Sequence, residues 1–421
     1  MDHFHVRAGV ANAEQVPLSK IAREVGTPVY VYSAAAMRSN ARGLQSALSA
    51  LDDPLIAYAV KANPNAAVLA TLAAEGLGAD IVSGGEYQRT RAVGIAADKI
   101  VMSGVGKTAA EMALALDGGL FQFNLESLPE AETLSQVAVA LGKAAPVAFR
   151  VNPDVDAGSH AKISTGGAHD KFGIPIGEAL AAFARLKQLP GLEIKGVAVH
   201  IGSQLTSLEP LESAFHGLGH LIEALRAAGH AITTADLGGG LGVSYDPSIQ
   251  APPNAGEYAA MVRRVTQGWG VRLIFEPGRL IVGNAGVLLT EVIRVKNGLS
   301  HPFVVVDAAM NDLLRPTLYD AWHSIEAVVP RGGQMRADVV GPVCESGDTF
   351  AKARTIDRVE AGDLMIIRTA GAYAATMGST YNSRPLTPEV LVDGDRWAMV
   401  RERQDVASII AGEKIPEWLP R

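Results

Sequence analysis

Eight short apolar runs, most of them followed by an Ala- and Leu-rich segment with helical spacing, dominate the first two thirds of the chain. They lie at residues 55–60, 79–82, 100–103, 120–124, 147–151, 196–200, 234–238 and 271–276. Strands that alternate with helices pair in parallel through right-handed crossovers, and eight such units close a (β/α)8 barrel. The pattern predicts an α/β fold with a TIM-like barrel; a doubly wound open sheet would show the same alternation.

Polar residues interrupt or end these apolar runs. They are Lys61, Asp80, Ser103, Asn124, Arg150, His200, Asp236 and Glu276. In a barrel of parallel strands, catalytic residues come from the carboxyl ends of the strands, where the loops begin. We therefore expect these side chains to gather at one mouth of the barrel.

The lysine after the first run is poorly explained as a surface charge. Residues 55–60 are apolar, which predicts a strand buried on both faces, and Asn63 and Pro64 end it just beyond Lys61. Partial desolvation favours the neutral amine, which can form a Schiff base with a carbonyl compound. The alternative is a lysine whose stem covers the strand end while its ammonium reaches water.

A second, β-rich domain is expected after about residue 283. Runs at 286–295, 303–307, 325–329, 364–367 and 397–400 alternate or are β-branched, and turn signals such as Lys-Asn-Gly at 296–298 separate them. This pattern predicts an all-β domain of the β-sandwich or Greek-key type. Candidate strands at 4–10 and 28–32 have no place in the barrel, because they precede a helix over 33–51 that Ser33 can cap. The expected division is 1–32 joining the β domain, 33–282 as the barrel, and 283–421.

Composition narrows the function classes. The formal net charge is −7 and no block of Lys and Arg occurs, which argues against a nucleic-acid surface. The single cysteine, Cys344, excludes an intramolecular disulfide and fits a reducing compartment. The N-terminus does not have the pattern of a signal peptide, and no apolar stretch is long enough to span a bilayer. We expect a cytoplasmic protein with neither a membrane nor a nucleic-acid partner, and no metal site.

Three further motifs follow predicted strands. The run Gly-Gly-Gly-Leu-Gly at 238–242 can point several backbone N–H groups at an anion, and a long Gly-, Ser- and His-containing segment at 153–175 is expected to be an active-site loop. Taken singly, Glu276 and Arg279 could form a structural ion pair, and His200 could be a satisfied core histidine. Together with Lys61 they supply what pyridoxal 5′-phosphate (PLP) needs: an amine, a flat group for the ring, an anion site and a carboxylate for the ring nitrogen.

At this point the sequence resembles the alanine-racemase-like, fold-type III family of PLP-dependent decarboxylases, and within it the diaminopimelate decarboxylases. The matching blocks span nearly the whole chain; they are residues 58–64, 80–86, 200–204, 236–242, 276–279, 315–319, 344–348 and 370–373. Each block is modest alone, and their combination is specific.

The resemblance implies a role for each matching residue at the cofactor. Lys61 would form the aldimine, oriented by Asp80 and Asn63; His200 would stack on the ring, and Glu276 would pair with the pyridine nitrogen. The remaining cofactor contacts, chiefly to the phosphate, would come from Ser203, Gly239, Gly240, Gly278, Arg279 and Tyr373.

The resemblance also implies a substrate and an assembly. Meso-2,6-diaminopimelate would lose carbon dioxide through a quinonoid intermediate to give L-lysine, the last step of lysine biosynthesis. The substrate would be bound by Arg279, Arg315, Tyr319, Glu345 and Tyr373. Cys344 would donate a proton from a loop that crosses a homodimer interface into the barrel of the second protomer.

Four rival functions remain to be weighed. An ornithine or arginine decarboxylase of the same fold is the main alternative, but its substrate ends in a cation, whereas Arg279 and Arg315 suit a second carboxylate. A carboxynorspermidine-type decarboxylase lacks several of the matching blocks. An alanine racemase carries an arginine where Glu276 stands. A non-catalytic relative would be expected to lose Lys61 or the phosphate loop, and both are intact here.

Overall fold

The computed structural model describes residues 3–155, 165 and 170–419. The chain forms two compact units. One comprises Met37–Gly283, and the other combines Met1–Ala36 with Asn284–Arg421. We call them the barrel unit and the β unit, and each is considered by itself.

The barrel unit is built on eight parallel strands that close on themselves. The strands are β5 (Leu55–Ala59), β6 (Gly78–Ile81), β7 (Ile100–Met102), β8 (Gln122–Leu125), β9 (Ala145–Asn152), β11 (Leu192–Val199), β12 (Thr234–Asp236) and β13 (Arg272–Phe275). Each pairs with the next in chain order; β13 pairs with β5, and β8 with β9, so no gap remains in the ring. The predicted TIM-like barrel is confirmed, and the open sheet is excluded. The short β10 (Ile174–Pro175) adds to β9.

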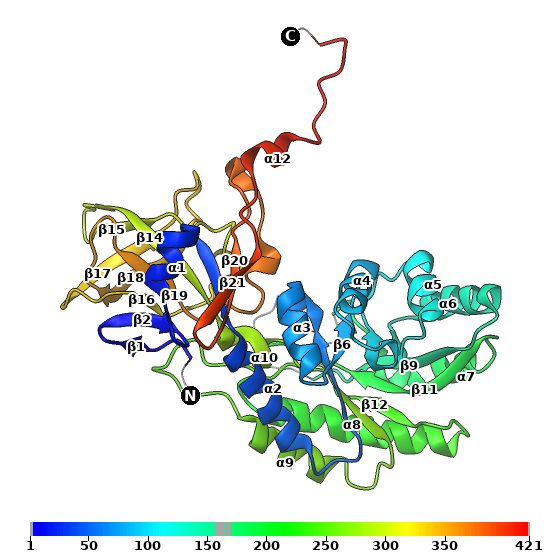
Figure 1. Ribbon diagram of the computed structural model, residues 1–421. Helices are drawn as coiled ribbons and strands as arrows, with labels where there is room; N and C mark the ends of the chain where they lie inside the picture. Colours follow the sequence, from blue (N-terminus) through cyan, green and yellow to red (C-terminus); the bar gives the residue numbers. More distant parts are fainter. Residues whose placement is uncertain (1–2, 156–164, 166–169, 420–421) are drawn as a thin grey trace. The chain divides into compact units, whose positions relative to one another are not determined.

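Helices cover the outside of this ring (Figure 1). They are α2 (Ala34–Leu48), α3 (Ala66–Ala74), α4 (Gly84–Ala92), α5 (Ala109–Asp117), α6 (Leu128–Leu141), α7 (Ala179–Leu186), α8 (Glu209–Ala227), α9 (Ala255–Val265) and the short α10 (Arg279–Val282). Helices α4 to α9 pack each on the next. Several begin at a polar cap; in α5, Thr108 and Glu111 form a capping box that satisfies two N–H groups at the helix start.

The helix expected after Ser33 also forms as predicted. The Ser33 hydroxyl accepts a hydrogen bond from the N–H of Ala36 at 3.0 Å. Met37, Leu44 and Leu48 are buried along one face of α2, since residues three to four apart, or seven, share a face of a helix. The carboxyl ends of the strands are therefore held by a ring of packed outer helices, several of which are capped.

The β unit centres on the long strand β14 (Gly286–Lys296). Its large sheet contains β4 (Val29–Ser33), β15 (Phe303–Val306), β16 (Ile325–Ala327), β17 (Gln334–Val340), β18 (Thr349–Asp357), β19 (Leu364–Ile367), β20 (Glu389–Asp393) and β21 (Arg396–Arg401). Strand β14 pairs with β4, β15 and β19. A hairpin at Asp393-Gly394 joins β20 to β21, where Gly394 has a φ of +67° that suits glycine.

The N-terminal residues take part in this unit. A small sheet of β1 (Val6–Arg7), β2 (Val10–Ala13) and β3 (Val16–Pro17) contributes side chains such as Phe4 and Val16 to a core shared with Val31 and Leu289 of the large sheet. The sequence interpretation missed the helix α1 (Leu18–Val25), and it described as all-β a unit that also holds α11 (Arg315–Tyr319) and α12 (Val406–Ile410). These helices are short, and their apolar spacing is too brief to stand out.

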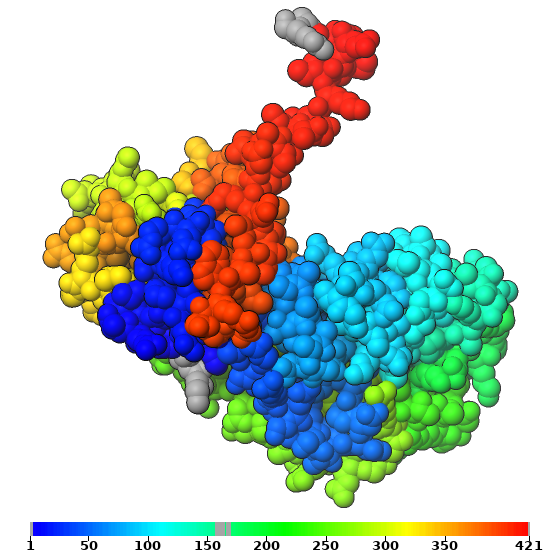
Figure 2. Space-filling view, in the orientation of Figure 1, coloured from blue at the N-terminus to red at the C-terminus, as the bar shows by residue number. Residues whose placement is uncertain are grey.

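The C-terminal segment of the β unit is apolar and exposed. Figure 2 shows it, in red, as a narrow extension beyond α12. Ile410, Ile415 and Trp418 are exposed to 58%, 68% and 84%. Among the described residues, no helix is long and apolar enough to cross a membrane.

Candidate active site

The polar residues predicted at the strand ends do converge on one mouth of the barrel unit. Four of them are among the last residues of their strands: Asp80, Asn124, Arg150 and Asp236. Lys61, Ser103, His200 and Glu276 come within two residues after a strand. Because all eight strands run in parallel, their carboxyl ends meet at the same rim.

Lys61 forms an ion pair at this rim. It sits in a 3-10 turn, Val60–Ala62, directly after β5, and its Nζ lies 2.5 Å from Asp80 Oδ2. The Asp80 side chain is fully buried, whereas that of Lys61 is 35% exposed. Asp80 Oδ1 is buried with no hydrogen-bond partner among the described residues. The amine is thus held at the rim by a buried carboxylate.

A chain of buried hydrogen bonds crosses the barrel interior beneath the lysine. Thr234 donates its hydroxyl to Gln122 Oε1 at 2.7 Å, and Gln122 Nε2 donates to Asn124 Oδ1 at 2.9 Å. The Asn124 oxygen is thereby used, so its NH2 group must point the other way. It donates to Asp236 Oδ2 at 2.8 Å and lies 3.1 Å from Ser103 Oγ. Side chains from three strands therefore fix the donors that face the carboxylates.

Asp236 and Glu276 form a coupled carboxyl pair at the end of that chain. Their side chains share a hydrogen bond, and Ser103 donates a second one to Glu276 Oε1 at 3.0 Å. Burial raises the pKa of Asp236 to about 6. Burial first, and then the nearby charges of Asp236 and Asp80, raise the pKa of Glu276 well above its usual value. Both carboxyls therefore bind a proton more readily than they would in water.

His200 is held as a neutral imidazole. Burial, and then the charges of Arg150 and Lys61, lower the pKa of His200 well below its usual value. Its Nδ1 lies 2.9 Å from Thr165 Oγ1, and its carbonyl accepts a bond from Arg150. Arg150 in turn forms a buried ion pair with Glu126 at 2.9 Å. A flat, uncharged ring at the rim is suited to stacking against a planar cofactor.

The loop after β12 needs its glycines because its backbone lies close to other backbone segments. A Cβ at Gly239 would lie 2.2 Å from the Glu276 carbonyl oxygen, and one at Gly240, where φ is +109°, would lie 2.7 Å from the Gly202 carbonyl oxygen. Gly238 donates its N–H to Asp236 Oδ1 at 2.9 Å. The loop therefore packs its backbone against the segments after β11 and β13, which brings backbone N–H groups close to the rim.

Arg279 joins the segment after β13 to the segment after β11. It is 5% exposed, and its guanidinium donates to Ser203 Oγ at 3.0 Å and to Tyr245 Oη at 2.5 Å. Gly278 is the N-cap residue of α10, immediately before Arg279. The structure thus brings Ser203, Gly278 and Arg279 together within the barrel unit, as the sequence analysis expected.

The β unit holds a second group of the expected residues. Arg315 begins α11, is 5% exposed, and has one guanidinium nitrogen 3.0 Å from His323 Nε2. Tyr319 ends the same helix. Between them, Thr317 donates its hydroxyl to the carbonyl of Gly347 at 2.7 Å, which ties α11 to the turn that follows Cys344.

Cys344 and Glu345 lie in that turn and are both exposed. Asp348 holds the turn by accepting the N–H of Val343 at 2.7 Å, and the Cys344 N–H donates to Asn382 Oδ1 at 3.1 Å. Tyr373 stands in another loop of the β unit with φ at +52°, a backbone region that non-glycine residues adopt rarely and at some cost.

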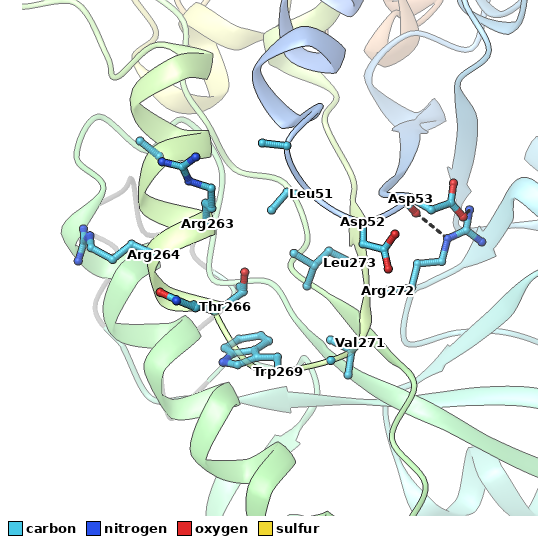
Figure 3. Close-up of a pocket in the computed structure, with 14 residues that line it drawn as sticks. Leu51, Asp52, Asp53, Arg263, Arg264, Thr266, Trp269, Val271, Arg272 and Leu273 are labelled. Carbon is cyan, nitrogen blue, oxygen red and sulfur yellow. Dashed lines mark hydrogen bonds and ion pairs between the residues drawn. The ribbon is translucent and has the colours of Figure 1, made fainter.

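One pocket of the barrel unit lies at the end where the strands begin. Its volume is about 1050 Å³, and it is lined where the strands begin, by residues before β5 and between α9 and β13. Figure 3 shows Trp269 and Leu273 on its wall, with Arg272 pointing toward Asp53. The Arg272–Asp53 ion pair spans 2.9 Å, and Asp53 is exposed. The size of this pocket does not make it the active site, because the buried charged residues lie at the carboxyl rim.

Two further expectations concern the loop at 153–175 and a metal site. Residues 156–164 and 166–169 of the expected loop at 153–175 lie outside the described residues, while Ile174–Pro175 form β10. Among the residues that the structure does describe, no group of His, Cys, Asp and Glu could hold a metal ion.

Sequence reasoning missed some residues of the rim. Asp236, Asn124 and Ser103 were noted as strand-end residues but given no role. Glu126 follows β8 in the same way as Glu276 follows β13, so the same rule could have found it. Nothing in the sequence around Tyr245 indicates its contact with Arg279.

Comparisons with known proteins agree with this geometry. Residues 37–283 match the family described as "Pyridoxal-dependent decarboxylase, pyridoxal binding domain", which covers the barrel unit. The barrel with its rim lysine is therefore that of a pyridoxal-dependent decarboxylase.

The full chain gives a narrower result. It is 53% identical over 418 residues to the diaminopimelate decarboxylase of Zymomonas mobilis, with 99% of both chains covered. A crystal structure of diaminopimelate decarboxylase from M. jannaschii in complex with L-lysine superposes with a TM-score of 0.95 at 33% identity, covering 99% of this chain and 98% of that one. One from Helicobacter pylori, also with L-lysine, gives 0.90 at 38% identity, covering 94% and 98%. The chain belongs to the diaminopimelate decarboxylase family.

Proposed function

We propose that this protein uses PLP to decarboxylate meso-2,6-diaminopimelate to L-lysine and carbon dioxide. The observation that carries the proposal is the rim of the barrel unit, where the Lys61 amine is paired with the buried Asp80 and shares its barrel end with the Asp236–Glu276 pair. Full-length identity to diaminopimelate decarboxylases supports this substrate over ornithine or arginine, which remain the alternative.

The residues present fit this cofactor. Asp80 Oδ1 is a buried acceptor without a partner among the described residues, beside the Lys61 amine. The loop of Gly238 to Gly240 has no room for Cβ atoms and presents backbone N–H groups, as a phosphate site requires. Ser203 and Arg279 add donors, and Glu276 is a carboxyl able to share a proton with a ring nitrogen.

In this proposal the barrel unit binds and orients. Lys61 Nζ would hold the cofactor through its carbonyl group, with loss of water, and Asp80 and Asn63 would position the amine. Gly239, Gly240, Ser203, Gly278 and Arg279 would hold the phosphate, with Tyr373 from the β unit. The neutral His200 would lie against the ring, and Glu276 would hold a proton at the ring nitrogen. When bound, the cofactor supplies an electron sink for the pair released as the bond from Cα to the carboxylate breaks.

The β unit, in the same proposal, selects the substrate and supplies the proton. Arg315 and Tyr319, with Arg279 and Tyr373, bind the distal carboxylate, for which a guanidinium fork is geometrically suited. Glu345 binds the distal ammonium. After carbon dioxide has left Cα, the Cys344 thiol would donate its proton to Cα in place of the carboxylate, which gives the amine product.

A cytoplasmic homodimer is part of the proposal. The Cys344 turn would act in the barrel of the second protomer, and the exposed apolar residues Ile410, Ile415 and Trp418 offer surface for a second copy. Mixing Lys61→Ala with Cys344→Ala protomers tests this arrangement. Shared sites would recover up to about a quarter of the activity, because half of the protomer pairs are mixed and each has one intact site. No recovery after exchange of protomers would rule out a shared site.

The deciding experiment is carbon dioxide release by the PLP-loaded protein. Meso-diaminopimelate, L-ornithine, L-arginine and L-lysine are offered separately, with Lys61→Ala as the control for background. We expect release from diaminopimelate alone, with lysine as the product. Release only from a basic amino acid would retain the PLP chemistry and reject the substrate assignment.

A further inference from the structure

The buried Asp236 has no role in the mechanism above, yet it touches the carboxyl assigned to the ring nitrogen. It is 1% exposed, ends β12, and hydrogen-bonds Glu276 on the neighbouring strand. Strands β12 and β13 are paired, with Asp236 opposite Ile274, so the barrel itself fixes this neighbourhood.

The donors around Asp236 determine its form. Oδ1 accepts the N–H of Gly238 at 2.9 Å, and Oδ2 accepts the NH2 of Asn124 at 2.8 Å. The Asn124 amide cannot turn around, because its oxygen already accepts from Gln122, whose own oxygen accepts from Thr234. With both oxygens facing N–H donors, Asp236 is held as the carboxylate, and the proton of the pair lies on Glu276.

Lys61 is the cation among the main influences on the pKa of Glu276, and its Nζ is already paired with Asp80, a third buried carboxylate. Burial first, and then the charge of Asp236, raise the pKa of Tyr258 of α9 above its usual value. A fixed negative charge beside Glu276 increases the proton affinity of Glu276, and it does the same for any basic atom that Glu276 contacts.

We propose that Asp236 is a positioning residue that shares one proton with Glu276 and keeps that proton available to the ring nitrogen of bound PLP. This inference rests on the assignment of Glu276 to the ring nitrogen. Asp236 acts through its charge and does not touch the cofactor. The three donors Thr234, Gln122 and Asn124 serve to keep that charge in place.

The test follows the protonation of the ring nitrogen directly. Wild-type protein and Asp236→Asn are loaded with PLP carrying ¹⁵N in the ring, and the ¹⁵N signal is recorded against pH. We expect the protonated ring to persist to higher pH in the wild type, with the midpoint lower in Asp236→Asn by about one pH unit or more. Equal midpoints would overturn the proposal.

Three further variants separate charge from folding. Glu86→Gln removes a titratable carboxyl near the same rim while a glutamine oxygen can still accept the Val82 N–H, and it should leave the midpoint unchanged. In Asp236→Asn, the NH2 group of the new side chain would face the NH2 group of Asn124, so two donors would lie opposite each other. The double variant Asn124→Asp with Asp236→Asn restores a donor and an acceptor and returns a carboxylate to within reach of Glu276, so it should regain the wild-type midpoint. A double variant that stays at the low midpoint, or a Glu86→Gln variant that matches Asp236→Asn, would refute a specific role for the charge.

A measurement on the wild type covers the case in which Asp236→Asn does not fold. The infrared band of a protonated carboxyl should be visible in the full chain before PLP is added and should disappear in Glu276→Gln; no such band would contradict the shared proton. Failure of the proposed function looks different. It would show as wild-type protein that does not bind PLP, or as a ring nitrogen that stays protonated in Glu276→Gln.

Discussion

The barrel unit and the β unit contribute residues of opposite character to the proposed site. In the barrel, Asp80, Asp236 and Glu276 are buried and held by neighbouring strands, and burial raises the pKa values of Asp236 and Glu276. In the β unit, Cys344 and Glu345 are exposed in a turn. We infer that the barrel is preorganised to bind the cofactor within one chain. The exposed turn, in contrast, would act on the substrate bound in the barrel of the second protomer. Variants in the two units should therefore fail in different ways.

Lys61→Ala should give the largest effect, because it removes the amine that binds the cofactor. We expect turnover to fall by more than about 10⁴-fold, together with loss of the absorbance of lysine-bound PLP. Arg263→Ala, in the pocket at the other end of the barrel, is the control and should keep both. If Lys61→Ala retains the absorbance, another amine holds the cofactor and the barrel is not the unit that binds it.

Cys344→Ala should distinguish most clearly between the role of the β unit in turnover and that of the barrel unit in cofactor binding. Loss of a proton donor lowers turnover by roughly 10²–10⁴-fold, while PLP absorbance should stay as in the wild type because the barrel is untouched. Spectra and single-turnover rates measured on the same preparation check both parts. Wild-type turnover would remove the thiol from the mechanism, and a changed spectrum would show that the β unit shapes the cofactor site.

The two units also differ in how far the sequence could predict them. The barrel follows from the repeated strand and helix pattern, and its rim residues appear as polar breaks in apolar runs. That Asp236 and Glu276 share a proton does not follow from the pattern, because it depends on which way the Asn124 amide faces, and Gln122 and Thr234 decide that. The roles of Cys344 and Arg315 came only from family resemblance, since an exposed turn and a one-turn helix leave no periodic signal.

Arg315→Ala should affect the substrate more than the cofactor. Losing a guanidinium that binds a carboxylate costs about 2–5 kcal/mol, so we expect KM for diaminopimelate to rise about 100-fold with little change in the Kd for PLP. Arg315→Lys keeps the charge without the fork and should lie between. Equal losses of PLP and substrate affinity would favour a structural role, through the contact with His323.

Glu276→Gln should have a smaller effect, on stability and with a definite sign. The pKa of Glu276 is raised above its usual 4.5, so the folded chain keeps a proton that the unfolded chain loses. That burial therefore costs stability as pH rises above about 4.5, by about 1.4 kcal/mol for each unit of pKa, until the folded-state pKa is passed.

A neutral glutamine at position 276 removes this cost, so the variant, compared with wild type after PLP removal, should gain more in its thermal unfolding midpoint at pH 8 than at pH 5. His200 acts in the opposite direction: its pKa is lowered, so its contribution is lost as pH falls below about 6.5, equally in both proteins, and it cancels from the difference. An equal gain at both pH values would mean that the Glu276 proton is not held by burial, and the electrostatic contrast between barrel and β unit would lose its main support.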